Sequence, residues 1–210
     1  MADAFYGAMS LSDRILQKLK RAEPDRVFTR SDFLDLGSTD AIGMAIQRLV
    51  KAGKLRHVGR GLYDIPRKHP LLGELSASSD AIAAAIARRD VIRLQPTEAA
   101  AANLLNLSEQ VPARIVYHTD RRRRTVKAGQ QTIEFRERSH RKMAAAGRAG
   151  GLVMAALRSL GRQHVTPEHL AHLRKLLKTS DRRRLLKDLR FAPAWMHPYM
   201  RLIAGEKKAV

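Results

Sequence analysis

The sequence contains no cysteine, which excludes disulfide bonds, thiolate nucleophiles and cysteine-ligated zinc. It also lacks any run of about 18 apolar residues, so no membrane-spanning helix is expected. Residues 1–10 lack the basic start and the apolar stretch of a secretory signal. These absences predict a cytoplasmic protein that has no membrane partner.

Acidic residues are scarce, because 20 Asp and Glu stand against 40 Lys and Arg and leave a formal net charge of +20. Such an excess is more than solubility needs and indicates a polyanionic partner. Residues 1–67 contain 12 basic and 8 acidic residues, whereas residues 68–210 contain 28 and 12. Most of the positive charge therefore lies in the second part of the chain.

Apolar residues make up 44% of the chain, which is enough to build hydrophobic cores and is unlike a disordered basic tail. A length of 210 residues suits one or two domains, and we expect two. We predict an α+β fold: a winged helix-turn-helix over residues 1–67, a linker over 68–78 and a mixed α/β domain over 79–210. The second domain is expected to contain a small antiparallel sheet and a helical C-terminus.

Two helices are predicted at the start of the first domain. Apolar residues at helical spacing predict a helix that begins near Leu11, after a serine cap, and ends before Pro24. The hydroxyl of Thr29 is expected to cap a short second helix. The side chains of this helix that should turn inward are Phe33, Leu34 and Leu36.

A third helix is predicted after a turn at Gly37, capped by Ser38 or Thr39 and closed by Gly53. Its buried stripe should consist of Ile42, Ala45, Ile46, Leu49 and Val50. The residues left on its free face are Thr39, Asp40, Gly43, Met44, Gln47, Arg48 and Lys51.

This free face suits the base edges of the major groove. A glutamine such as Gln47 can pair with adenine, and an arginine such as Arg48 can pair with guanine. Gly43 would let the helix backbone approach the DNA closely. The face therefore predicts a recognition helix.

A tight hairpin is predicted over residues 54–65, with Gly59-Arg60-Gly61 at its turn. We interpret this hairpin as the wing. Arg60 can reach a minor groove or a phosphate because nothing bulky flanks it, and Arg56 could assist. The alternative is that the three helices and the hairpin form only a structural or protein-binding module.

The second domain should begin with a helix from Ser79 or Asp80, a short strand over 91–95 and a helix opened by Pro96. Strands are predicted over 113–119 and 132–138, which should pair, and over 124–127. Ile115, Tyr117, Ile133 and Phe135 are expected to point inward, and Arg114, Val116 and His118 outward.

The last third of the chain is predicted to be helical. A helix is expected over 143–160, a second is capped by Thr166, and a third begins at Ser180. Trp195 should dock on the domain. A run of four arginines, 121–124, should lie near a sheet edge, where it contacts phosphates or forms a solvated face.

The complete set of expected DNA-binding residues combines the helices, the wing and the arginine run: Thr29, Arg30, Ser38, Thr39, Gly43, Met44, Gln47, Arg48, Lys51, Arg56, Arg60, Arg121, Arg122, Arg123 and Arg124.

A catalytic or metal site is not expected, and neither is a cofactor. His169 and His172 lie three residues apart on a helix, but no carboxylate pair or cysteine completes a metal site. The glycines near 147–151 lack the Gly-Lys-Ser or Gly-Lys-Thr that a phosphate loop requires. A nucleic-acid-processing enzyme is the third hypothesis for this chain, and we expect no enzyme.

The order of these features resembles the AbiEi family of bacterial antitoxins over most of the chain. The residues that carry the resemblance are Phe28-Thr29-Arg30-Ser31-Asp32-Phe33, Leu55 to Tyr63, Leu94-Gln95-Pro96-Thr97-Glu98-Ala99-Ala100, Ile115 to Thr119 and Ile133 to Arg136. The combination of the first two segments with the third is more distinctive than any segment alone.

The resemblance implies an antitoxin of type IV, which represses its own operon and counteracts a nucleotidyltransferase-like toxin without having to bind it. It also implies binding to inverted repeats in double-stranded operator DNA, with the second domain helping cooperative occupation by a monomer or weak dimer. The second hypothesis is a stand-alone winged-helix regulator that has no toxin.

Overall fold

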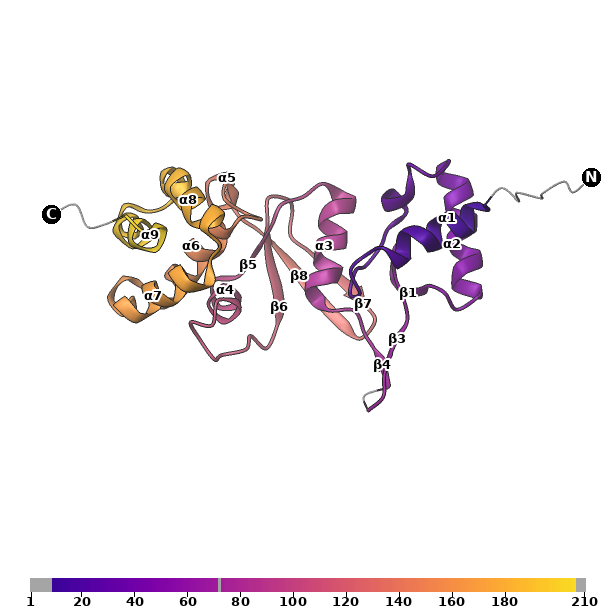
Figure 1. Cartoon of the computed structure of the whole chain (residues 1–210), viewed down its shortest axis with the longest axis horizontal. Helices are drawn as coiled ribbons and strands as arrows, with labels where there is room; N and C mark the ends of the chain where they lie inside the picture. The colour runs from indigo at the N-terminus through magenta and orange to yellow at the C-terminus, as the bar shows by residue number, and fades with distance from the viewer. Residues whose placement is uncertain (1–8, 72, 207–210) are drawn as a thin grey trace, which may run out of the picture. The chain divides into compact units, whose positions relative to one another are not determined.

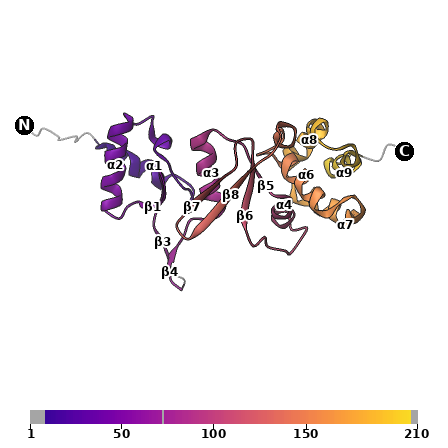
Figure 2. The ribbon, with the colours of Figure 1, turned by 180° about the vertical axis from the view of Figure 1, so that it is seen from behind.

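The computed structural model describes residues 9–71 and 73–206, which form a mixed α+β fold (Figures 1 and 2). Two compact units are present: the described residues of Met1–Val91 with Lys127–Thr132, and those of Ile92–Val126 with Ile133–Val210. Within the described residues, no helix combines the length and the apolar character needed to cross a bilayer.

The described residues of the first unit form four helical segments and two hairpins. In chain order these are α1 (Leu11–Lys20), η1 (Arg30–Phe33), α2 (Thr39–Lys51), β1 (Arg56–Gly59), β2 (Leu62–Asp64), β3 (Arg67–His69), β4 (Gly73–Leu75) and α3 (Ser79–Asp90). β1 pairs with β2 and β3 with β4, both antiparallel. The β3–β4 hairpin extends away from the helices of its unit (Figures 1 and 2).

The helices of the first unit begin where polar caps predict. The hydroxyls of Ser10, Ser38 and Ser78 each accept the backbone N–H three residues later, which satisfies a donor that the helix leaves free. The core that these helices enclose consists of Ile15, Leu19, Phe28, Phe33, Ile42, Ala45, Ile46, Leu49, Leu55 and Tyr63. Leu34 was expected inside but is 53% exposed, because η1 is a short 3-10 helix that ends at Phe33.

The division between the units differs from the expected linker over residues 68–78. Parts of that segment form the β3–β4 hairpin, and the helix after it, α3, belongs to the first unit. Arg88 of α3 donates to the carbonyl of Val27 at 2.7 Å, and Arg89 donates to the carbonyl of Arg60 at 2.8 Å. These contacts attach α3 to the helices and hairpin that precede it.

The sheet of the second unit has the strand order β5–β6–β8–β7. Its strands are β5 (Leu94–Pro96), β6 (Ile115–Thr119), β7 (Arg124–Ala128) and β8 (Gln131–Glu137), of which residues 127–132 count with the first unit. β5 and β6 are antiparallel, but β6 and β8 are parallel, with Ile115 opposite Ile133. The prediction of an antiparallel sheet is therefore wrong for this pair of strands. The chain reverses direction once into the edge strand β7 and again into β8, so β8 runs in the same direction as β6.

One side chain of this sheet that was expected to be solvated is buried. His118 was expected to point outward but is only 5% exposed. Gln95 lies opposite it on β5, and Glu98, the first residue of the next helix, lies 3.9 Å from its ring. The face that was expected to be solvated is therefore covered.

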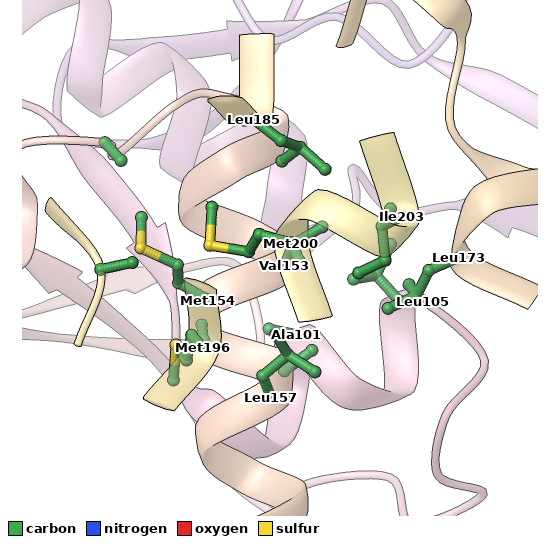
Figure 3. Packing of buried hydrophobic residues seen from close by; sticks show 14 of the residues in the cluster. Ala101, Leu105, Val153, Met154, Leu157, Leu173, Leu185, Met196, Met200 and Ile203 are labelled. Carbon is green, nitrogen blue, oxygen red and sulfur yellow. The ribbon is translucent and has the colours of Figure 1, made fainter. Parts of the chain in front are cut away.

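The helices of the second unit are α4 (Glu98–Leu104), α5 (His140–Met143), α6 (Ala149–Leu160), α7 (Pro167–Leu176), α8 (Thr179–Asp188) and α9 (His197–Ala204), with short 3-10 turns at Arg162–His164, Leu189–Phe191 and Ala194–Met196. The expected helix over 143–160 is interrupted near Gly147, which has a φ of +74°. Figure 3 shows side chains of α4, α6, α7, α8 and α9 meeting in one apolar core, to which Trp195 adds its ring.

The start of α6 is packed too closely for any side chain. Gly150 lies against the carboxylate of Asp188, which is almost fully buried. This carboxylate forms an ion pair with Arg148 at 2.9 Å. Gly151 lies against the backbone of Ala145 and the amide of Gln95. These glycines therefore serve helix packing, since the buried carboxylate already fills the space at the helix start.

Candidate nucleic-acid interface

The two faces of α2 differ in character. Ile42, Ala45, Ile46 and Leu49 are buried in the core of the first unit. The exposed residues of α2 are Thr39, Asp40, Met44, Gln47, Arg48 and Lys51. Within residues 9–71 and 73–206, no carboxylate forms an ion pair with Arg48 or Lys51. The outward face of α2 therefore offers an amide, a thioether and two unpaired cations to a partner, with one carboxylate, Asp40, in its first turn.

Two residues that were expected to contact DNA form helix caps instead. The hydroxyl of Ser38 accepts the N–H of Ala41 at 3.3 Å and so caps α2. Thr29 is only 1% exposed, and its backbone N–H donates to Asp32 at 2.8 Å in a capping box. Thr29 therefore positions η1 and does not face a partner, contrary to the sequence-based expectation.

Asp32 holds the start of η1 in place. Burial acts to raise the pKa of Asp32, but the N–H of Thr29, the charge of Arg88 and the guanidinium of Arg26 outweigh it and lower this pKa below its usual value. Arg26 lies 3.0 Å and Arg88 3.4 Å from the same carboxylate oxygen. The charged form of Asp32 thus fixes η1 against α3.

Gly43 does not offer its backbone to a partner. It is buried, and a Cβ built on it would lie 3.5 Å from the guanidinium carbon of Arg30. The expectation that Gly43 admits a DNA backbone is therefore wrong, since the side chain of Arg30 occupies the space. Arg30 itself is exposed and forms an ion pair with no carboxylate in the described part of the chain.

The β1–β2 hairpin carries two arginines in opposite roles. Arg56 donates to both oxygens of Asp64, at 3.0 and 2.6 Å, and to the carbonyl of Leu75 at 2.7 Å. The hydrogen bonds to Asp64 raise the pKa of Arg56. Arg56 is therefore an internal brace and not the additional DNA contact that was expected.

Arg60 stands at the turn of the hairpin, next to Gly61, whose φ of +68° allows the tight reversal. Its carbonyl accepts from Arg89, which fixes the backbone, while its side chain is exposed. No carboxylate of the described residues pairs with this side chain. Arg60 is thus a free cation on a fixed turn.

The hairpin also has a neighbour that the sequence does not reveal. The N–H of Gly129 donates to the carbonyl of Val58 at 2.7 Å, and Gly59 lies close to the backbone of Lys127. Lys127 is exposed, so the segment beside this hairpin supplies a second cation. No local pattern could have predicted this proximity, since the residues in contact are 68 and 71 positions apart in the sequence.

The four arginines of residues 121–124 differ in their surroundings within the second unit. Arg123 forms an ion pair with Glu134 at 2.8 Å, and the guanidinium of Arg124 lies 5.3 Å from the ring centroid of Phe135. Arg121 and Arg122 are exposed and form no ion pair among the residues that the structure describes. The run thus offers two free cations near the edge strand β7, as its sequence position predicts.

The histidines that were considered as metal ligands contact the backbone. The ring of His172 lies 2.9 Å from the carbonyl of Leu105, and the ring of His169 accepts the N–H of Thr166 in a capping box. Among the described residues, no group of three or more His, Cys, Asp or Glu side chains is placed to hold a metal ion.

Because His118 is buried, we expect the stability of the second unit to depend on pH. Burial lowers the pKa of His118 below 6.5; Glu98 opposes this shift, and Arg138, Arg136 and Lys142 reinforce it. Because the folded state favours the neutral ring, its contribution is present above pH 6.5 and is lost as the pH falls through the folded pKa. We expect urea unfolding, followed by tryptophan fluorescence, to need less urea at pH 5.5 than at pH 7.5.

The substitution His118→Gln separates this histidine from the carboxylates, which also titrate in acid. The difference in unfolding midpoint between the two pH values should shrink in the variant. An equal difference in both proteins would assign the pH dependence to other groups.

A family model matches residues 14–185. The chain belongs to DUF6088, a family of unknown function. No curated protein matches this DUF6088 chain. Among solved structures, the chain is similar to the crystal structure of the RV2827C protein from Mycobacterium tuberculosis, with 19% identity and a TM-score of 0.44. This similarity covers 94% of the present chain and 78% of the mycobacterial one.

The structure of this DUF6088 protein brings most of the expected residues of the first unit onto two exposed elements. Thr39, Met44, Gln47, Arg48 and Lys51 share the outward face of α2, and Arg60 lies on the hairpin turn. Arg121–Arg124 belong to the second unit.

Proposed function

We propose that this DUF6088 chain is a DNA-binding transcriptional repressor whose α1–β2 segment is a winged helix-turn-helix. In this proposal α2 is the recognition helix and the β1–β2 hairpin is the wing. The observation that carries the proposal is the outward face of α2, where Gln47, Arg48 and Lys51 are exposed and the cations lack acidic partners among the described residues. A solvated helix face ordinarily mixes cations with acids that pair with them.

Each exposed group has a role that follows from its chemistry. The amide of Gln47 and the guanidinium of Arg48 can form paired hydrogen bonds with base edges in the major groove. Lys51, in the last turn of α2, suits a phosphate. Arg60 on its fixed turn can contact the backbone or the minor groove beside the helix. Arg121 and Arg122 are proposed to add phosphate contacts from the second unit.

The antitoxin part of the proposal depends on the AbiEi resemblance of the sequence. In that reading the repressor controls the operon that encodes it and a nucleotidyltransferase-like toxin, which it counteracts in the cytoplasm. Occupation of inverted repeats would couple the amount of antitoxin to its own synthesis. The chain itself is not proposed to be an enzyme.

The experiment that tests DNA binding uses the purified full chain and the duplex upstream of its own reading frame. Nuclease footprinting should reveal a protected segment at protein concentrations that leave random DNA of equal length unprotected. Equal protection of both duplexes would reduce the proposal to charge attraction, and no protection of either would reject it. A neighbouring reading frame for a nucleotidyltransferase-like protein would support the antitoxin part.

Substitutions should separate base contacts from backbone contacts. We expect Gln47→Ala and Arg48→Ala to reduce the preference for the protected sequence over random DNA by about 1–3 kcal/mol for each lost base contact. Arg60→Ala should instead weaken binding to both duplexes by similar factors. Fluorescence anisotropy titrations at one salt concentration measure both quantities.

The matched control for these variants is Arg162→Ala, which removes an exposed cation of the second unit outside the proposed interface. Its binding should equal that of the unchanged chain. If all three interface variants lose the same factor on both duplexes, the assigned division between base and backbone contacts is incorrect.

A further inference from the structure

We infer that Arg30 is a specificity-determining residue, whose guanidinium takes the place of a side chain at position 43 of α2 and reads a guanine in the major groove. This inference rests on the proposed DNA-binding function and assigns one base contact within it. The guanidinium belongs to η1 but lies on α2, which no pattern along either segment would indicate.

The contact geometry defines the orientation of the group. A Cβ at Gly43 would lie 3.5 Å from the Cζ atom of Arg30 and 3.7 Å from each terminal nitrogen. Because Cζ is the nearest atom and the nitrogens are equidistant, the flat face of the guanidinium lies against the helix. The N–H bonds lie in the plane of the group, so they point along the helix surface and not into it.

The donors of Arg30 have no competing partner. The side chain forms no hydrogen bond or ion pair with any of the described residues. Its backbone, by contrast, follows directly after Thr29, which the capping box with Asp32 holds at 2.8 Å. A fixed backbone, a supporting surface of glycine and unoccupied donors are the properties of a preorganised recognition group.

The place of the guanidinium on α2 determines what it would contact. Gly43 lies one helical turn after Thr39 and one turn before Gln47, so the three positions form one row on the helix. The guanidinium enters this row between two exposed side chains. A planar fork at this point matches the O6 and N7 acceptors of guanine, next to the base that Gln47 contacts.

The same guanidinium could instead contact a phosphate of the same duplex. The substitution Arg30→Lys distinguishes a contact with guanine from a contact with phosphate. The full chain first selects its preferred duplex from a random library, and single base-pair variants of that duplex are then titrated. With the unchanged chain, replacing one G·C pair should weaken binding about tenfold or more. Arg30→Lys should remove this preference at that pair alone, because an ammonium keeps the charge but lacks the fork.

Gly43 provides an independent test in which Arg30 is retained. In Gly43→Leu the new side chain occupies the space of the guanidinium, so the same base preference should be lost. Gly43→Ala is the matched control, because its Cβ would make an ordinary van der Waals contact and leave Arg30 in place. Thermal unfolding of each variant establishes that the first unit remains folded; if Gly43→Leu does not fold, Arg30→Lys still decides.

The outcomes separate the inference from the proposed function. Uniform weakening by Arg30→Lys on every duplex, with all base preferences retained, would assign Arg30 to a phosphate and overturn the inference while leaving the repressor proposal intact. Binding of the unchanged chain to no duplex in the library would overturn both.

Discussion

Replacing Gly151 with alanine is expected to lower the stability of the second unit by about 3 kcal/mol or more, a large fraction of the stability of an ordinary domain. A Cβ at this position would overlap the carbonyl oxygen of Ala145 and lie 2.6 Å from Oε1 of Gln95. The first obstacle is backbone, so a side-chain rotation cannot relieve it. The start of α6 would have to move away from the turn that precedes it.

The measurement for Gly151→Ala is urea unfolding followed by the fluorescence of Trp195, the only tryptophan of the chain. Trp195 packs against the core of the second unit and therefore reports its unfolding. Gly37→Ala is the matched control, because its Cβ would meet only side-chain atoms of Leu11 at 3.7 Å. Its global unfolding, followed by circular dichroism, should change by less than about 1 kcal/mol. An unchanged unfolding midpoint for Gly151→Ala would contradict the close approach of Gly151 to the backbone of Ala145.

The substitution Arg56→Ala is expected to destabilise the first unit by about 3–5 kcal/mol, since it leaves a buried carboxylate without its partner. The side chain of Asp64 is only 5% exposed, and Arg56 is the one residue with an ion pair to it among those described. Alanine also removes the hydrogen bond to the carbonyl of Leu75, which links β4 to the β1–β2 hairpin.

Arg60→Ala is the control for Arg56→Ala, because it removes a cation from the same hairpin without exposing a buried charge. Thermal unfolding should be within about 0.5 kcal/mol of the unchanged protein for Arg60→Ala. DNA binding should respond in the same variant, so the two arginines separate stability from function. A fully stable Arg56→Ala would contradict its assignment as a brace.

The helices could be predicted from the sequence because their signals are local. A hydroxyl cap, an apolar repeat and a closing glycine lie within 15 residues of one another in α2, and a hydroxyl cap with an apolar repeat also marks α1 and α7. The hairpin around Arg60 was also predicted correctly, since the turn glycine and the alternation of its strands are adjacent in sequence.

The features that sequence did not reveal depend on contacts between distant segments. The attachment of α3 to the first unit depends on hydrogen bonds from Arg88 and Arg89 to carbonyls about 61 and 29 residues earlier. The parallel pairing of β6 with β8 is a matter of strand order, which alternation cannot encode. The contact of His118 with Glu98, the first residue of α4, likewise joins two segments that no local pattern relates.

The candidate site shows the same division. The outward residues of α2 follow from helical periodicity, and the structure exposes Met44, Gln47 and Arg48 as that periodicity requires. The roles of Thr29, Gly43 and Arg56 could not be predicted, because each depends on a particular partner. The space beside a glycine on a helix surface can be filled by a ligand or by a neighbouring side chain. At Gly43 the side chain of Arg30 fills it, which only the structure reveals.

The most direct test of the central claim, that the outward face of α2 enters a DNA duplex, uses the absence of cysteine from the chain. In Met44→Cys the introduced thiol is the only one present, at a position that is 54% exposed in the native residue. At a saturating concentration of the footprinted duplex, its alkylation should slow by about tenfold or more. Val111→Cys, at an 80% exposed position of the second unit, is the reference thiol for reagent effects. An unchanged alkylation rate of Met44→Cys under saturation would contradict the claim.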